Sequence, residues 1–174
     1  RWWPVVKGRI DRALTAGFDG AYLDLVTAYE EIPSTENERE ALAHKMVDLI
    51  ARISQYAKSK DPKFKIVPQN CPELYTWAFW EPKPNQKYFN AVDGLGLESV
   101  FYLAHDKPAD ASWCKENRDN ALALRKAGKL VLGIDYAKKA KNISSAYARQ
   151  REMGFVPYAS VRDLNVISHP PSTK

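Results

Sequence analysis

The sequence predicts an α/β protein in which short parallel strands alternate with helices. Two observations predict this class. Short apolar segments without polar alternation recur along the chain, as expected for strands of a parallel sheet. Between them lie longer segments whose apolar residues recur at the spacing of an amphipathic helix. Because the connections are short, consecutive strands are expected to be parallel and joined by right-handed crossovers.

A helix over residues 3–16 and a strand over residues 20–24 are expected at the start of the chain. Gly17 supplies the stop signal of the helix. The strand carries no charge until its last residue, Asp24, which is typical of a strand buried on both faces. The apolar stripe of the helix consists of Val6, Ile10, Ala13 and Leu14.

The longest periodic segment predicts an amphipathic helix over residues 37–60, after a polar loop. The next strand is expected over residues 64–68 and ends on the polar pair Gln69 and Asn70. A long loop rich in aromatic residues and prolines follows this strand. A short helical piece is then expected near Tyr88.

The second half of the chain repeats the alternation of strand and helix. The third strand closes on Glu98 and continues into residues 99–102, and a loop over residues 103–112 comes next. The remaining elements are a helix over 113–127, a strand over 129–136, a helix over 142–153 and a strand over 155–159.

The polar residues of the strands gather at their carboxyl ends. Open doubly wound sheets and closed (β/α)8 barrels both bind ligands at that edge. The segment Gly94-Leu95-Gly96 lacks the third glycine and the following helix of a nucleotide-binding turn, which favours the TIM (β/α)8 barrel. Only five strands are found, so residues 1–174 are expected to be a single domain that forms the C-terminal portion of a barrel, about strands four to eight. The polar residues are Asp24, Gln69, Asn70, Glu98, Asp135, Tyr136 and Ser160.

Four motifs, spread over almost the whole chain, resemble glycoside hydrolase family 114. Members of this family are barrel enzymes described as endo-α-1,4-polygalactosaminidases. The resemblance implies cleavage of a galactosamine-containing polysaccharide, outside the cell or at the cell envelope. The motifs are GFDGAYLD at 17–24, IVPQN at 66–70, DGLGLESVFY at 93–102 and VLGIDY at 131–136.

Asp24 and Glu98 are the expected catalytic carboxylates. A carboxylate next to apolar surface loses hydration that only a partner, a proton or a substrate replaces. Glycoside hydrolysis needs one protonated acid and one ionised carboxylate. We expect Asp24 to be the nucleophile or stabilising carboxylate and Glu98 to be the general acid/base, although the reverse assignment is open. The alternative is that both are structural acids in ion pairs.

Polar and aromatic residues near these acids are expected to bind the polysaccharide. Amide groups suit sugar hydroxyls, an acid with a neighbouring tyrosine suits a substrate ammonium, and aromatic rings stack on pyranose faces. The alternatives are a structural role for Asp135 and a loop-anchoring role for the aromatic residues. The expected substrate-binding residues are Gln69, Asn70, Tyr102, Asp135, Tyr136, Tyr29 and Trp77.

Composition and spacing argue against other classes of function. The net charge of +5 is scattered, and the cluster at residues 138–141 is too short for a nucleic-acid footprint. No apolar run is long enough to span a membrane. No cluster has metal-site spacing, so neither a metal nor a cofactor is expected, and Cys71 and Cys114 either pair or remain free thiols. A non-catalytic carbohydrate-binding barrel is the alternative function, and self-association is one way to complete the barrel.

Overall fold

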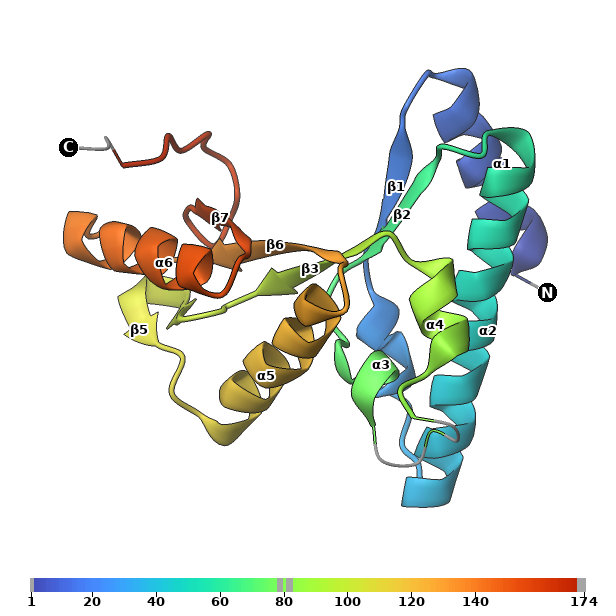
Figure 1. Cartoon of the computed structure of the whole chain (residues 1–174), viewed down its shortest axis with the longest axis horizontal. Helices are drawn as coiled ribbons and strands as arrows, with labels where there is room; N and C mark the ends of the chain where they lie inside the picture. Colours follow the sequence, from blue (N-terminus) through green and yellow to red (C-terminus); the bar gives the residue numbers. More distant parts are fainter. Residues whose placement is uncertain (1, 78–79, 81–82, 172–174) are drawn as a thin grey trace. The chain divides into compact units, whose positions relative to one another are not determined.

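The computed structural model describes residues 2–77, 80 and 83–171, which form two compact units, Arg1–Gly94 and Leu95–Lys174. In both units helices alternate with strands, so the predicted α/β class is confirmed (Figure 1). That the whole chain is one domain stays a prediction. The first unit contains α1 (Trp3–Thr15), β1 (Gly20–Leu23), the 3-10 helix η1 (Val26–Tyr29), α2 (Glu36–Lys60), β2 (Lys65–Pro68), α3 (Glu73–Thr76) and α4 (Gln86–Ala91).

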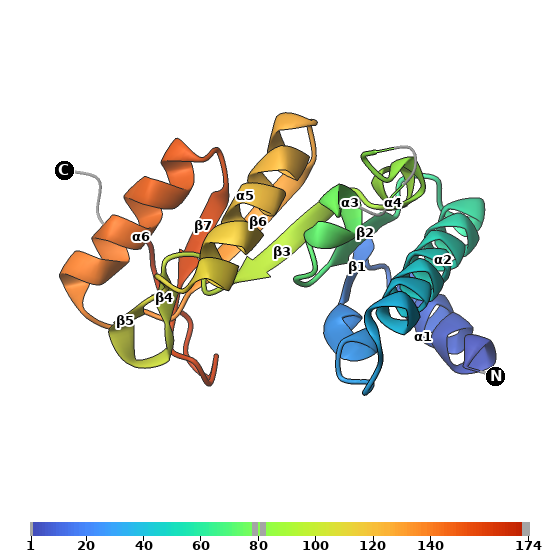
Figure 2. The same cartoon turned by 90° about the horizontal axis from the view of Figure 1, so that it is seen from below.

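The first unit is built on a parallel pair of strands. β1 pairs with β2 in the register Gly20↔Lys65 to Leu23↔Pro68. Figures 1 and 2 both show α1 and α2 packed together beside this pair. Its core is formed largely by one face of α2, by β2 and by α4. The most buried side chains of this core include Val47, Ile50, Phe64, Ile66, Leu74 and Tyr88.

β1 differs from its prediction in burial. The segment was expected to be buried on both faces, but Gly20, Ala21 and Leu23 are half-buried and Tyr22 is 49% exposed. The reason is its position, because among the described residues β1 pairs with β2 alone and forms the edge of a two-stranded sheet. An apolar run therefore predicted the strand correctly and its burial wrongly.

The second unit is built on a three-stranded sheet with the order β3-β6-β7. β6 and β7 are parallel, in the register Leu132↔Val156 to Asp135↔Ala159. The two helices α5 and α6 pack on these strands through small and apolar residues such as Ala121, Leu124 and Ala146. The elements are β3 (Gly94–Glu98), β4 (Tyr102–Leu103), η2 (Ala104–Asp106), β5 (Lys107–Pro108), α5 (Ser112–Lys126), β6 (Leu130–Asp135), α6 (Ala140–Glu152) and β7 (Val156–Ala159).

The segment after β3 was predicted as a continuing strand over 99–102 and a loop over 103–112. Instead β3 ends at Glu98, and Ser99 turns the chain with a φ of 55°. β4 then pairs with β5 as a small antiparallel ribbon, Tyr102↔Pro108 and Leu103↔Lys107. The strand prediction failed here because one residue in the left-handed region breaks an extended run that still looks apolar in the sequence.

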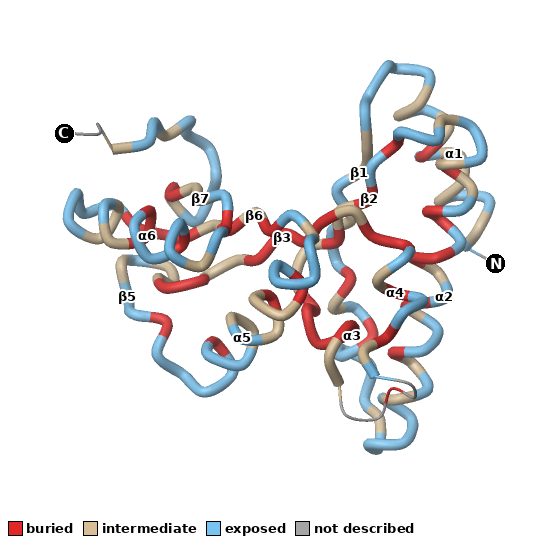
Figure 3. The backbone as a smooth tube through the Cα atoms, viewed as in Figure 1, coloured by how far each residue is buried: buried red, intermediate tan, exposed pale blue. Residues whose placement is uncertain are grey.

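Burial follows the strands and the inner faces of the helices in each unit. In Figure 3 the buried stretches run along β2, β3 and β6, whereas the outer turns of α2 and α6 are exposed. Within the described part of the chain, no helix combines the length and the apolar character that a membrane crossing requires. Cys71 and Cys114 are both buried, and each carries a free thiol in the structure.

Replacing Gly133 by Ala is expected to destabilise the second unit by about 1–3 kcal/mol. A Cβ at Gly133, in β6, would lie 2.1 Å from Gln150 Oε1. Gln150 cannot swing aside freely, because it is fully buried and its Nε2 donates to Asp135 Oδ2 at 2.7 Å. Urea unfolding of the full chain measures the change.

Gly8→Ala is the matched control for this substitution. A Cβ at Gly8, inside α1, meets no atom within 4 Å, so the same change should stabilise the chain by about 0.5–1 kcal/mol. Equal effects at the two glycines would contradict the close approach of Gln150 to β6.

Candidate carbohydrate site

The carboxyl ends of β1 and β2 bring three predicted site residues to one edge. Because the strands are parallel and Leu23 is opposite Pro68, Asp24 and Gln69 follow their strands at the same level. The N–H of Gln69 donates to the carbonyl oxygen of Leu23 at 2.9 Å. Asn70 comes next in the same segment and is half-buried. Asp24, Gln69 and Asn70 are therefore neighbours, as the sequence predicted for residues at parallel strand ends.

Asp24 is exposed, and its Oδ1 accepts a hydrogen bond from the N–H of Leu25 at 2.8 Å. Leu25 has a φ of 57°, although it is a bulky residue whose side chain is 70% exposed. A bulky residue in the left-handed region is strained, and such strain concentrates at functional sites. The same conformation recurs at two other strand ends, at Asn70, which follows Gln69, with a φ of 62° and at Ser99, which follows Glu98, with a φ of 55°.

Tyr29 lies in the interior of the first unit and packs against Trp77, so its ring is not on an open platform. Tyr29 is only 3% exposed, and its ring meets that of Trp77 edge-on at a centroid distance of 6.1 Å. Trp77 is half-buried. Stacking of either ring on a sugar stays a prediction, and these contacts support the alternative in which the aromatic residues anchor the loops.

Sequence reasoning missed a cluster next to this edge in which Tyr29, Cys71 and Glu73 are buried and Glu30 is exposed. The hydroxyl of Tyr29 donates to Glu73 Oε1 at 2.9 Å, and Glu30 Oε1 lies 3.3 Å from the same hydroxyl. Burial raises the pKa of Glu73 to about 6 and also raises the pKa of Cys71 and of Tyr29. The sequence shows only an acid, Glu73, within a segment rich in aromatic residues and prolines. This pattern does not indicate which side chains contact the acid.

Three members of this cluster could hold a metal ion. One potential ligand atom from each of Glu30, Cys71 and Glu73 lies within 4.8 Å of the other two. A thiolate with two carboxylates is a set of donors that suits Zn²⁺. The sequence predicted no metal site, because Glu30 is remote from the other two residues along the chain and the fold alone brings them together.

Glu73→Gln is expected to remove a pH dependence of stability. A carboxyl whose pKa rises from 4.5 to about 6 on folding stabilises the fold fully below pH 4.5, and this contribution is lost as the pH rises through 6. Above that pH the buried charge costs about 2 kcal/mol. Glutamine stays neutral and still accepts the hydrogen bond from Tyr29. At neutral pH the free energy of unfolding of the variant should therefore exceed that of wild type by about 2 kcal/mol.

Urea unfolding of both proteins between acidic and neutral pH measures this difference. Glu116→Gln is the control, because Glu116 is exposed on α5. A difference between Glu73→Gln and wild type that does not change with pH would contradict the raised pKa of the buried Glu73.

In the second unit the predicted acid Glu98 contacts a tyrosine and an arginine. Glu98 closes β3, and its Oε1 accepts a hydrogen bond from the hydroxyl of Tyr136, which follows β6. Arg162 Nη1 lies 3.7 Å from the same carboxylate oxygen and donates to the Tyr136 hydroxyl at 3.3 Å. Glu98 and Tyr136 were predicted for the site, whereas Arg162, in the segment after β7, was missed.

Asp135 is fully buried, and both of its carboxylate oxygens are occupied by protein donors. Oδ1 accepts from the N–H of Phe101 at 2.6 Å and of Tyr102 at 2.7 Å, and Oδ2 accepts from Gln150. Burial raises the pKa of Asp135 against the opposing effect of these bonds. A substrate contact of Asp135 stays a prediction, and this geometry supports its structural alternative. Tyr102 is half-buried beside it.

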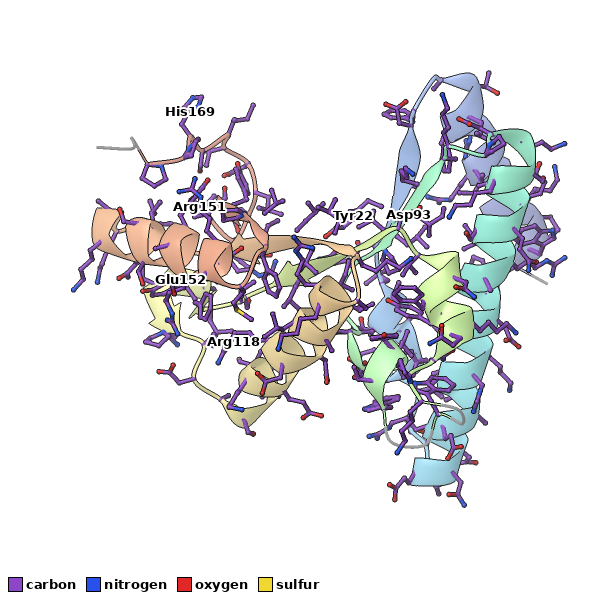
Figure 4. The ribbon with its side chains drawn as sticks, viewed as in Figure 1. Tyr22, Asp93, Arg118, Arg151, Glu152 and His169 are labelled. Carbon is purple, nitrogen blue, oxygen red and sulfur yellow. The ribbon has the colours of Figure 1, made fainter. Side chains whose placement is uncertain are left out.

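Two charged residues fix the ends of the segment that carries Glu98. Asp93, before β3, accepts from the N–H of Ile66 and pairs with Lys58 Nζ, each at 2.9 Å. Burial opposes ionisation of Asp93, but the bond from Lys58 holds its pKa below the usual value. Arg118, which extends from α5, donates to the carbonyl oxygens of Val100 at 2.7 Å and Ala109 at 2.9 Å (Figure 4).

The chain is similar to a family of carbohydrate-cleaving proteins. A sequence model described as glycoside-hydrolase family GH114 matches residues 1–172. Uncharacterized proteins from three organisms also match. One from Deinococcus radiodurans is 30% identical, over 94% of this chain and 49% of that protein. One from Thermotoga maritima is 27% identical, over 95% of this chain and 51% of that protein. One from Methanocaldococcus jannaschii is 26% identical, over 93% of this chain and 47% of that protein. The chain thus spans about half the length of these relatives.

A solved structure has the same fold. The glycoside hydrolase domain of PelA from Pseudomonas aeruginosa superposes with a TM-score of 0.71 at 18% sequence identity. The match covers 97% of this chain and 63% of that domain. At this identity the likeness concerns the fold, which is the α/β arrangement with parallel strands described above.

Proposed function

Because the chain belongs to glycoside-hydrolase family GH114, we propose that it is a glycoside hydrolase that cleaves an α-linked, galactosamine-containing polysaccharide. Asp24 and Glu98 would be its two carboxylates. The observation that carries this proposal is their placement at strand ends. Asp24 directly follows β1 and Glu98 closes β3, and the carboxyl ends of parallel strands are where α/β enzymes hold their catalytic groups.

The chemistry needs these two acids in different protonation states. When the bond between the anomeric carbon and the glycosidic oxygen breaks, the leaving oxygen takes both electrons of that bond and a proton from the acid. The ionised carboxylate either bonds to the anomeric carbon or accepts a proton from the water that attacks it. Carboxyl groups about 5–5.5 Å apart lead to retention and groups about 6.5–9.5 Å apart lead to inversion of the anomeric centre.

We extend the proposal to the architecture of the chain. The strands would form the C-terminal portion of a (β/α)8 barrel, about strands four to eight. The structural match, which covers 97% of this chain but only 63% of the PelA hydrolase domain, supports this view. Self-association is one way to supply further strands. A polymeric substrate also fits a location outside the cell or at its envelope.

Reducing-end release from a partly deacetylated α-1,4-galactosamine polymer tests the function. We expect release from this polymer and none from a β-linked glucosamine polymer of similar charge, which controls for non-specific binding of a polycation. Retention of the α-linked polymer in a pull-down without any reducing ends would replace the hydrolase with a non-catalytic carbohydrate-binding protein. If the α-linked polymer is neither bound nor cleaved, the proposed substrate is wrong.

A further inference from the structure

Three potential metal ligands of the first unit converge from two segments of the chain. Glu30 directly follows η1, whereas Cys71 and Glu73 lie where β2 leads into α3. One ligand atom of each residue lies within 4.8 Å of the other two. In a tetrahedral site with bonds of about 2.0–2.3 Å, the ligand atoms are about 3.3–3.8 Å apart. The exposed side chain of Glu30 has the freedom to close this difference.

The cluster gathers acidic groups without a positively charged partner. The Tyr29 hydroxyl lies 2.9 Å from Glu73 Oε1 and 3.3 Å from Glu30 Oε1, but it has a single hydrogen to donate. Within the described part of the chain, no lysine, arginine or histidine forms an ion pair with Glu30 or Glu73. A buried carboxylate beside a second acid is costly unless a proton or a cation compensates it.

A buried tyrosine adds a polar group without a partner at the same place. Tyr88, in α4, is 0% exposed, and its hydroxyl has no hydrogen-bond partner among the described residues. Burial, Cys71 and Glu73 raise the pKa of Tyr88, in this order, so its hydroxyl lies on the side of the cluster. Figures 1 and 2 show α3 and α4 side by side. A water molecule bound to a cation in the cluster would donate to this hydroxyl and remove the cost of its burial.

We propose that Glu30, Cys71 and Glu73 bind one Zn²⁺ ion. A water molecule that donates a hydrogen bond to Tyr88 occupies the fourth position of the tetrahedron. The sulfur ligand favours Zn²⁺ over Mg²⁺ and Ca²⁺, which prefer oxygen ligands. On binding, the Cys71 thiol releases its proton to the solvent and the Zn–S bond forms. The ion braces the segments that follow η1 and β2, a role that goes beyond the proposed hydrolysis.

Binding of Co²⁺ identifies the ligands, because this ion takes tetrahedral zinc sites and absorbs visible light. The full chain, without a histidine tag and stripped of metal by a chelator, is titrated with Co²⁺. We expect one Co²⁺ per chain, the d–d bands of a tetrahedral site and a thiolate-to-cobalt charge-transfer band, and Zn²⁺ should displace them all. Cys71→Ser should abolish the charge-transfer band. Cys114→Ser changes the other buried thiol and should keep it.

Zn²⁺ affinities, measured by competition with a coloured chelator, test the remaining groups. Tyr88→Phe removes the partner of the bound water and should weaken binding by about 10–100-fold. Glu30→Gln should weaken it further, because it removes a ligand. Glu30 is exposed, so this variant is expected to fold even if Cys71→Ser does not. Glu31→Gln, at the neighbouring exposed acid, is the matched control and should leave the affinity unchanged.

Unfolding in urea provides a further readout, because an ion that binds only the folded chain stabilises it. Without metal at neutral pH, Glu73→Gln is expected to be more stable than wild type. Saturating Zn²⁺ should reverse this order, since wild type alone keeps all three ligands. Failure of wild type to bind Co²⁺ and Zn²⁺ would overturn the site. Wild-type affinity in Glu30→Gln, or a charge-transfer band that persists in Cys71→Ser, would overturn it equally.

Discussion

Glu98→Gln and Asp24→Asn are each expected to lower kcat for polymer cleavage by about 10²–10⁴, with KM nearly unchanged. Each amide keeps the shape of its acid and removes either the transferable proton or the negative charge. In the proposed mechanism both acids act on the same bond, so the double variant should lose little more activity than the more impaired of the two single variants. Reducing-end assays with excess polymer measure kcat, and circular dichroism confirms that each variant is folded.

Matched controls separate this effect from a general loss of carboxylates. Asp19 lies directly before β1, whereas Asp24 lies directly after it, and both are exposed. Asp19→Asn therefore makes the same change at the opposite end of the same strand. Glu116→Gln is the corresponding control in the second unit. A wild-type kcat in Asp24→Asn would show that this acid is not catalytic. An equal loss of kcat in Asp19→Asn would show that the assay responds to charge and not to catalysis.

Asp135→Ala is expected to destabilise the chain by about 3–5 kcal/mol. The substitution leaves the N–H groups of Phe101 and Tyr102 and the Nε2 of Gln150 buried without an acceptor. Two of these donors belong to the segment that turns the chain after Glu98. Loss of their acceptor should therefore also disorder the surroundings of Glu98 and lower any activity. Urea unfolding measures the stability.

Asp135→Asn should cost less, at about 1–2 kcal/mol. Gln150 Oε1 is buried and has no hydrogen-bond partner among the described residues, so the Gln150 amide can turn over and accept from the new Asn NH₂. Asp119→Ala is the control, because Asp119 forms an exposed pair with Lys115 one helical turn away and should change stability by less than about 0.5 kcal/mol. Similar losses in Asp135→Ala and Asp119→Ala would refute the buried network.

The local pattern of the sequence predicted most helices and strands of this protein. The stripe of α1, the stop at Gly17 and the long periodicity of α2 all depend on neighbours within a few residues, and the structure confirms each one. The family was also predicted from short motifs, and the match over residues 1–172 confirms it. The placement of Asp24, Gln69 and Asn70 together followed from parallel pairing, which the alternation of elements already implied.

Only the tertiary structure decided which groups surround the predicted acids. The sequence presented Asp135 and Glu98 alike, as acids at strand ends, but the fold gives Asp135 three protein donors and Glu98 a tyrosine and an arginine. Arg162 reaches Glu98 from the segment after β7, and Glu30 meets Cys71 and Glu73 from an earlier segment of the chain. Periodicity records the burial of a face over a few residues. It carries no information on which distant side chains meet, and those contacts set the charge and hydrogen bonding of a site.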